Sequence, residues 1–117
     1  MQENASTALV SFTAKLWLYN TEKAAWHFIT LPNAAGDKIR FFTAQDMPSN
    51  RRSRGFGSVK VVATIGTTNW RTSVFPYKEG DINSYILPVK REVRVREGLG
   101  EGDMAEVSLS LADSPLP

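Results

Sequence analysis

The chain has no cysteine and a single histidine, and these two shortages remove several classes of site. Without cysteine there is no disulfide, no thiolate zinc site and no cysteine nucleophile. His27 by itself cannot supply the imidazole and thiolate ligands of a usual transition-metal site. We therefore predict a protein with no metal site and no cofactor. The lack of cysteine also fits a reducing compartment.

Long apolar runs and targeting signals are missing as well. No segment approaches the roughly 20 apolar residues that a membrane helix needs. The first six residues, Met1 to Ser6, lack the basic and apolar regions of a signal peptide. We therefore expect a cytoplasmic protein that is not in a membrane.

The net charge is small, but the charged residues are unevenly distributed along the chain. The net charge is +2, which is small for a protein that binds nucleic acid. Residues 51–60 contain Arg51, Arg52, Arg54 and Lys60 and no acid, whereas four acids and no base lie in residues 98–117. The basic segment is either a solvated loop or a local anion site.

With 117 residues, 42% of them hydrophobic and 22% charged, the chain has the composition of one globular domain. We expect that domain to cover 1–117, with loose tails at 1–7 and 114–117. Alternating apolar and polar residues predict strands at 10–18, 26–31, 59–65, 70–75, 83–87 and 104–112. Short helices are predicted at 34–46, capped by Asn33, and from Pro88 to a stop at Gly98.

The apolar phase of these strands predicts the core. Prolines 32 and 76 are expected to end the second and fourth strands. The predicted core residues are Phe12, Leu16, Phe28, Val61, Ile65, Val74, Ile86, Val107 and Leu109.

One short stretch, "RSRGFGSVKV", approaches the strand motif by which RNA-recognition domains bind RNA. Arg54, Gly55, Phe56 and Gly57 fit the motif, but Ser58 stands where a stacking aromatic is required. Two strands also precede the first helix, whereas such a domain has one. The stretch is better interpreted as a loop entering a strand, with Phe56 buried and glycines that allow unusual backbone angles.

Two segments, "RGFGSVKVVATIGTTNWRTSVFP" and "YILPVKREVRVREGLGEGDMAEVSLSL", resemble a family of small bacterial proteins catalogued as a domain of unknown function (nineteen-oh-five). The resemblance also includes Trp26 ahead of Leu31 and Pro32, and covers nearly the whole chain. It implies a mainly β fold, a small split (pseudo)barrel of about six strands with two short capping helices, grouped with the swapped-hairpin barrels of AbrB-type regulators. Some relatives carry a second, YdeI/OmpD-associated domain, for which this chain is too short. The resemblance implies no activity.

Few residues suggest chemistry. His27 lies beside Trp26 on a strand, on the face of Ile29 and Leu31, and is interpreted as a packing residue rather than a catalytic base. Asp103 follows Gly102 and is expected to bind the backbone of its own turn. We predict no catalytic residue.

Arg71 within a strand is the more unusual feature. It is either paired with an acid across the sheet or clamps a carboxylate or phosphate. The candidate anion site consists of Arg54, Trp70, Arg71, Ser73, Lys90 and Arg94.

Three functional classes stay open. The first is a binding module for a small anionic ligand or a protein partner. The second is a DNA-associated protein, which is suggested only by analogy with AbrB-type barrels. The third is a metal-independent enzyme. A closed apolar pocket containing Arg71 would favour the first class, and a basic groove between the loop 51–54 and the helix after Pro88 would favour the second. The oligomeric state is not predicted.

Overall fold

The computed structural model describes residues 8–46 and 57–112, which form a mainly β fold, as predicted. In chain order the elements are β1 (Val10–Asn20), β2 (Ala25–Thr30), α1 (Asn33–Asp46), β3 (Val59–Ile65), β4 (Thr68–Glu79), β5 (Ile82–Pro88), α2 (Arg91–Glu97) and β6 (Met104–Leu111). The predicted tails and the segment 47–56, with Arg54, Gly55 and Phe56, lie outside the described residues.

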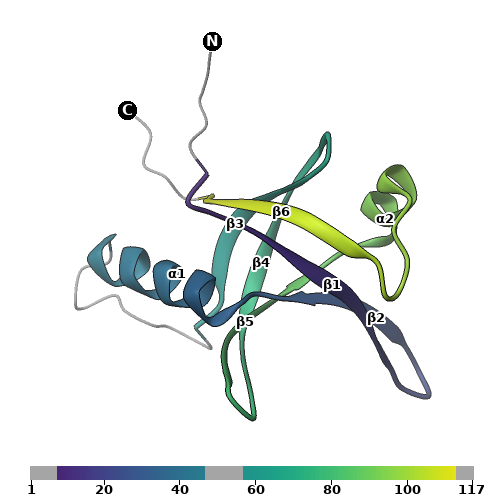
Figure 1. The fold of residues 1–117 in the computed structure, drawn as a ribbon, viewed down its shortest axis with the longest axis horizontal. Helices are drawn as coiled ribbons and strands as arrows, with labels where there is room; N and C mark the ends of the chain where they lie inside the picture. Colours follow the sequence, from purple (N-terminus) through teal and green to yellow (C-terminus); the bar gives the residue numbers. More distant parts are fainter. Residues whose placement is uncertain (1–7, 47–56, 113–117) are drawn as a thin grey trace.

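The strands close into an antiparallel barrel in the order β1-β2-β5-β4-β3-β6, with α1 and α2 on opposite sides (Figure 1). Two strands change partner along their length. β1 pairs with β6 up to Lys15 and with β2 from Leu16 onward. β4 pairs with β3 up to Val74 and with β5 from Phe75 onward. The hairpins β1–β2 and β4–β5 therefore extend beyond the rest of the barrel as two arms (Figure 1).

The barrel interior confirms most of the predicted core. Six of the nine predicted core residues are buried, and Phe12 is half-buried against them. The buried six are Leu16, Val61, Ile65, Val74, Val107 and Leu109.

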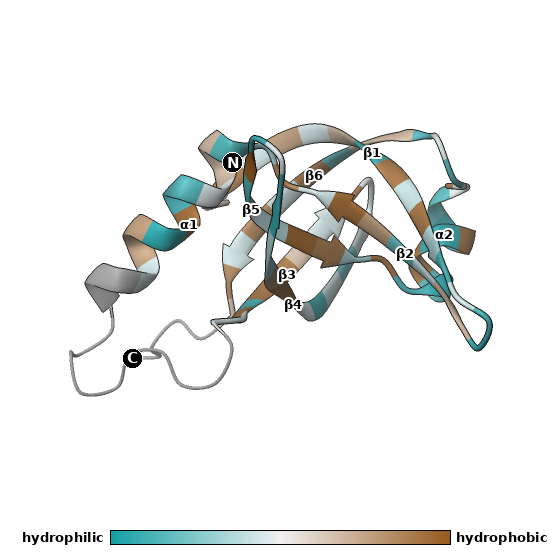
Figure 2. Ribbon diagram, turned by 90° about the horizontal axis from the view of Figure 1, so that it is seen from below, coloured by the Kyte–Doolittle hydropathy of each residue, from teal (hydrophilic) through white to brown (hydrophobic). Residues whose placement is uncertain are grey.

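The prediction was wrong for Phe28 and Ile86, which are only half-buried and face outward. Their neighbours Ile29 and Leu87 are fully buried instead. Both strands carry apolar residues on both faces, so the sequence pattern does not indicate which face points into the barrel. Figure 2 shows the resulting hydrophobic segments in β2 and β5.

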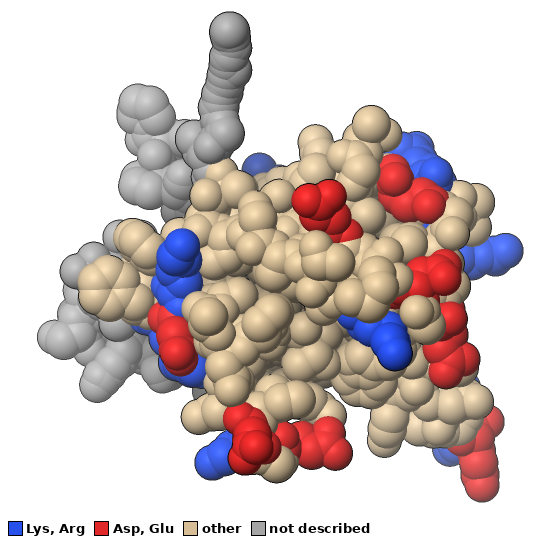
Figure 3. Space-filling model, viewed as in Figure 1, with Lys and Arg blue, Asp and Glu red and all other residues tan. Residues whose placement is uncertain are grey.

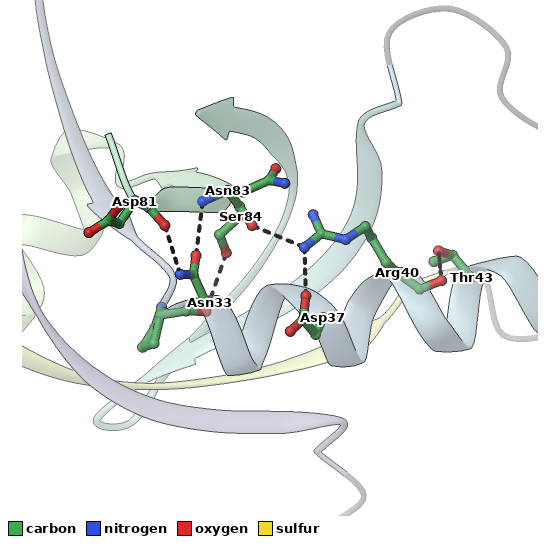
Figure 4. A network of polar contacts seen from close by, with 8 residues as sticks. Asn33, Asp37, Arg40, Thr43, Asp81, Asn83 and Ser84 are labelled. Carbon is green, nitrogen blue, oxygen red and sulfur yellow. Dashed lines mark hydrogen bonds and ion pairs between the residues drawn. The ribbon is translucent and has the colours of Figure 1, made fainter. Parts of the chain in front are cut away.

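Helix α1 does not begin with the predicted cap. The Asn33 amide donates to the Asp81 carbonyl at 3.0 Å and accepts from the Asn83 amide at 2.9 Å, which ties the helix start to β5 (Figure 4). Gly36 then packs so closely on Ser84 that an added Cβ would overlap the serine hydroxyl. Ala35 and Ile39 of α1 are buried in the core.

The two prolines near β5 also differ from the prediction. Pro76 lies within β4, opposite Tyr85 of β5. It lies beyond the part of β4 that pairs with β3, which stops at Val74. A proline is tolerated there because no neighbouring strand on that side needs a hydrogen bond from its backbone nitrogen. Pro88 ends β5, and α2 begins only at Arg91. The predicted stop at Gly98 is confirmed, with a left-handed φ of 64°.

Two further backbone predictions are confirmed. Gly57, which leads into β3, has a φ of +80°, a conformation that side-chain-bearing residues rarely adopt. The Asp103 carboxylate accepts a hydrogen bond from the Gly100 amide at 2.9 Å, within its own turn. Neither described helix is long and apolar enough to cross a membrane.

Candidate functional site

An apolar cleft lies on the outer surface of the barrel, between the two hairpin arms. It has a volume of about 420 Å³. We call it the aromatic cleft, because six of its eight lining side chains are aromatic. Its lining residues are Trp17, Tyr19, Trp26, Phe28, Phe75, Tyr77, Ile86 and Pro88.

The alternation of the strands explains why these side chains share one surface. Leu16 points into the barrel, so Trp17 points outward, and its register partner Phe28 lies beside it on β2. Phe28 in turn pairs with Pro88 of β5. Phe75 pairs with Ile86 on the other arm. The cleft is therefore the outer face of the four-stranded sheet β1-β2-β5-β4.

The rings at the base of the cleft are close but not parallel. The Trp17 ring centroid lies 5.3 Å from that of Phe28 and 5.9 Å from that of Tyr77, with interplanar angles of 45° and 41°. Trp26 lies parallel to Phe28, with centroids 6.2 Å apart. One pair of rings is therefore stacked, whereas Trp17 is tilted against both of its neighbours.

The side chains at the rim remain exposed to solvent. Tyr19 and Trp26 are each 52% exposed and Phe75 is 42% exposed. Figure 3 shows charged side chains at the tips of both arms, along the lower edge of the molecule. A large exposed apolar patch with a polar rim is typical of an interaction site.

The polar groups at the base of the cleft already have partners. The Trp17 indole N–H donates to the Thr30 hydroxyl at 2.8 Å. The Tyr77 hydroxyl donates to the Glu79 carboxylate, and this hydrogen bond is the main reason that the pKa of Tyr77 is raised above its ordinary value. Neither donor is left free for a ligand.

A second, more polar cleft of about 580 Å³ lies between the β3–β4 turn and α2. We call it the basic cleft, and it contains two of the predicted site residues, Trp70 and Lys90. Lys90 also forms an ion pair with Glu92 at 3.4 Å. The full lining is Thr68, Asn69, Trp70, Lys90, Arg91, Glu92, Val93, Val95 and Arg96.

The structure does not bring the other predicted site residues to the basic cleft. Trp70 is buried, and Arg71 lies on the opposite, outer face of β4, as adjacent strand residues must. Ser73 shares that outer face and pairs in register with Lys60. Arg94 donates to the Val89 carbonyl at 3.1 Å and thereby holds α2 against the end of β5. Arg54 lies outside the described residues.

Arg71 has no ion pair with any acid among residues 8–46 and 57–112. The predicted pairing across the sheet is therefore not found within that part of the chain. Arg71 is also not part of the aromatic cleft's lining. An apolar pocket containing Arg71, the arrangement expected for an anionic ligand, is not formed by the described residues.

His27 is half-buried on the inward face of β2, with its Nδ1 atom buried and without a hydrogen-bond partner among the described residues. Burial lowers the pKa of His27, and the nearby Arg94 guanidinium adds to this effect, whereas Glu101 opposes it. The described residues contain no group of three histidine, aspartate or glutamate side chains that could hold a metal ion. The interpretation of His27 as a packing residue stays a prediction.

Sequence reasoning missed the aromatic cleft, although a signal for it was present. "LWLY" in β1 and "WHFI" in β2 are apolar on both faces. A strand that is apolar on both faces has an outer apolar face in addition to the one in the core. That outer face is either covered by another element or exposed as an apolar surface. Here no described element covers the outer face of Trp26 or Phe75.

The fold and the cleft define a small six-stranded barrel that carries an exposed aromatic surface. Residues 12–109 match DUF1905, a domain of unknown function, and the chain belongs to that family. The match spans all six strands in whole or in large part. No curated protein has significant sequence similarity to this chain.

Proposed function

We propose that the protein is a small binding module and that its binding site is the aromatic cleft. The observation that carries this proposal is the clustering of six aromatic side chains around an open hollow of about 420 Å³. Small-molecule sites have volumes of roughly 300–1,000 Å³ and are lined mostly by apolar and aromatic side chains. The ligand is a small molecule with an apolar or aromatic body.

The energetic argument is that the exposed rings keep apolar surface in contact with water. Trp26, Tyr19 and Phe75 lie at the rim, and their exposure leaves apolar surface in water that a ligand could cover. Covering apolar surface contributes about 25 cal/mol for each Å² removed from water. Because several rings line one cleft, a single ligand can cover apolar surface on more than one of them.

The other functional classes have less support. The six candidate anion-site residues do not converge, as far as they are described, and the basic cleft is only partly built from them. A DNA-binding role would depend on Arg51, Arg52 and Arg54, which lie outside the described residues. An enzyme would need a nucleophile or a general base at the cleft, and the lining offers only the hydroxyls of Tyr19 and Tyr77, the second of which donates to Glu79.

Titration with a neutral aromatic probe, benzyl alcohol, followed by amide NMR spectra tests the proposal. We expect saturable shifts in the amide signals of Trp17, Phe28 and Phe75. The amide signals of Thr64 and Ser108, on the polar outer face of β3 and β6, should not move. Shifts spread evenly over the protein, or centred on α2, would contradict the assignment of the site to the aromatic cleft.

A further inference from the structure

We infer that the aromatic cleft selects ligands with a quaternary ammonium group, such as a trimethylammonium head, over neutral ligands of the same shape. This inference rests on the proposed function and specifies the class of ligand. Two features carry it: the aromatic, uncharged lining of the cleft and the Glu79 carboxylate that is hydrogen-bonded to it.

The lining is mostly aromatic, with six rings around one hollow. Trp17 makes interplanar angles of 45° with Phe28 and 41° with Tyr77, so these rings are tilted against one another. The face of an aromatic ring carries partial negative charge, and a cation within about 6 Å of the ring centre is attracted to it. Indole rings are the strongest partners, and Trp26 adds a second indole at the rim.

Among the hydrogen bonds of residues 8–46 and 57–112, the one that joins an ionised side chain to the lining involves a negative group. The Glu79 carboxylate accepts a hydrogen bond from the hydroxyl of Tyr77, whose ring lines the cleft. None of the eight lining side chains is charged, so within the described residues the lining provides no counter-charge for an anion. A cation in the cleft would be favoured both by the ring faces and by Glu79.

The ligand also suits the few polar groups of the lining. The Trp17 indole N–H is engaged by Thr30 and the Tyr77 hydroxyl by Glu79, which leaves the Tyr19 hydroxyl and the Trp26 indole N–H at the rim as the remaining donors of the lining. A quaternary ammonium group needs no donor and no acceptor, because it has no N–H. Its methyl groups also cover apolar surface, so it fits a lining made of rings, Ile86 and Pro88.

Choline and 3,3-dimethylbutan-1-ol provide the test, because they have the same shape and differ only in the charged nitrogen. The dissociation constant of each is measured by NMR titration of the wild-type protein. We expect choline to bind roughly three- to thirty-fold more tightly, the range that a cation–π contact provides. Equal binding, or tighter binding of the neutral alcohol, would overturn the inference.

Two variants locate the selectivity. Glu79→Gln removes the carboxylate charge, and Trp26→Leu keeps an apolar side chain but removes the ring. Both side chains are exposed, so neither change should unfold the protein. Each variant should reduce the ratio of the two affinities, mainly by weakening choline. An unchanged ratio in both variants would show that the aromatic cleft is not the source of the selectivity.

Failure of this inference can be separated from failure of the proposed function. If benzyl alcohol binds in the cleft but choline shows no preference, the cleft is a binding site and only the preference for a cation is wrong. If choline, its neutral analogue and benzyl alcohol all fail to bind, both the inference and the proposed function are wrong.

Discussion

The rings of Trp17 in β1 and Tyr77 in β4 lie 5.9 Å apart between centroids, although two other strands separate β1 from β4 in the sheet. This contact joins the two hairpin arms across the base of the aromatic cleft. It requires the outer face of the sheet to curve inward there, and it explains why the arms enclose a hollow instead of lying flat.

The contact between the arms predicts an energetic coupling. Trp17→Leu and Tyr77→Leu should each destabilise the protein, and the double variant should lose less than the sum of the two. Aromatic pairs contribute about 0.5–1.5 kcal/mol beyond their buried area, and the coupling should fall in this range. Urea unfolding of the four proteins measures the coupling, and strictly additive losses would show that the two arms are energetically independent.

Gly36→Ala should destabilise the protein, although the same change usually stabilises a helix by about 1 kcal/mol. An added Cβ at this position would overlap the Ser84 hydroxyl and lie 2.9 Å from the Ser84 Cβ. Such overpacking costs about 1–3 kcal/mol. Introducing Ser84→Gly into the Gly36→Ala protein should recover part of the loss. A higher melting temperature for Gly36→Ala alone would contradict the close packing of α1 on β5.

His27 predicts a dependence of stability on pH. Burial lowers its pKa in the folded protein below the ordinary value of 6.5, so the unfolded chain binds the proton more readily. The contribution of His27 to stability is therefore complete at pH values above its pKa in the unfolded chain. This contribution declines as the pH falls below that pKa. Urea unfolding from pH about 7.5 to about 5 should show this decline in the wild type. In His27→Gln the decline should be smaller, and identical pH profiles for the two proteins would argue against a lowered pKa of His27 in the folded protein.

The anion site suggested by the sequence stays a prediction, and the structure now gives it two distinguishable locations. Arg71 lies near Ser73 and Lys60 on the outer face of β3 and β4, whereas Arg91 lines the basic cleft. We expect sulfate to raise the melting temperature saturably and Arg71→Met to abolish the rise, because a ligand that binds only the folded state stabilises it. Arg91→Met is the matched control. Loss of the rise in Arg91→Met instead would move the site to the basic cleft.

The sequence was sufficient for the fold because most strands are apolar on one face only. In β3, Val61, Ala63 and Ile65 alternate with outward-facing residues, and the structure buries all three. In β6, Val107 and Leu109 do the same. The closed order of the strands was not readable from these patterns, but the family resemblance implied a barrel, and the structure has one.

The candidate site was not predictable by the same reasoning. Phe28 and Ile86 were assigned to the core because alternation cannot distinguish the faces of a strand that is apolar on both. Trp70 and Arg71 were placed in one site although neighbouring strand residues face opposite ways. The helix start at Asn33 depends on contacts with Asp81 and Asn83, which are remote in the sequence. Only the paired strands bring such residues together.

The account depends most on the aromatic cleft being a binding site, and one comparison of affinities tests this directly. The dissociation constant of benzyl alcohol is measured for the wild type, for Trp26→Ala and for Phe41→Ala. Phe41, on α1, is an exposed aromatic residue outside the cleft and serves as the control. We predict that Trp26→Ala weakens binding by about five- to thirty-fold, which corresponds to the loss of one aromatic wall, and that Phe41→Ala leaves it unchanged. Equal affinity in all three proteins, or a loss confined to Phe41→Ala, would contradict the central claim.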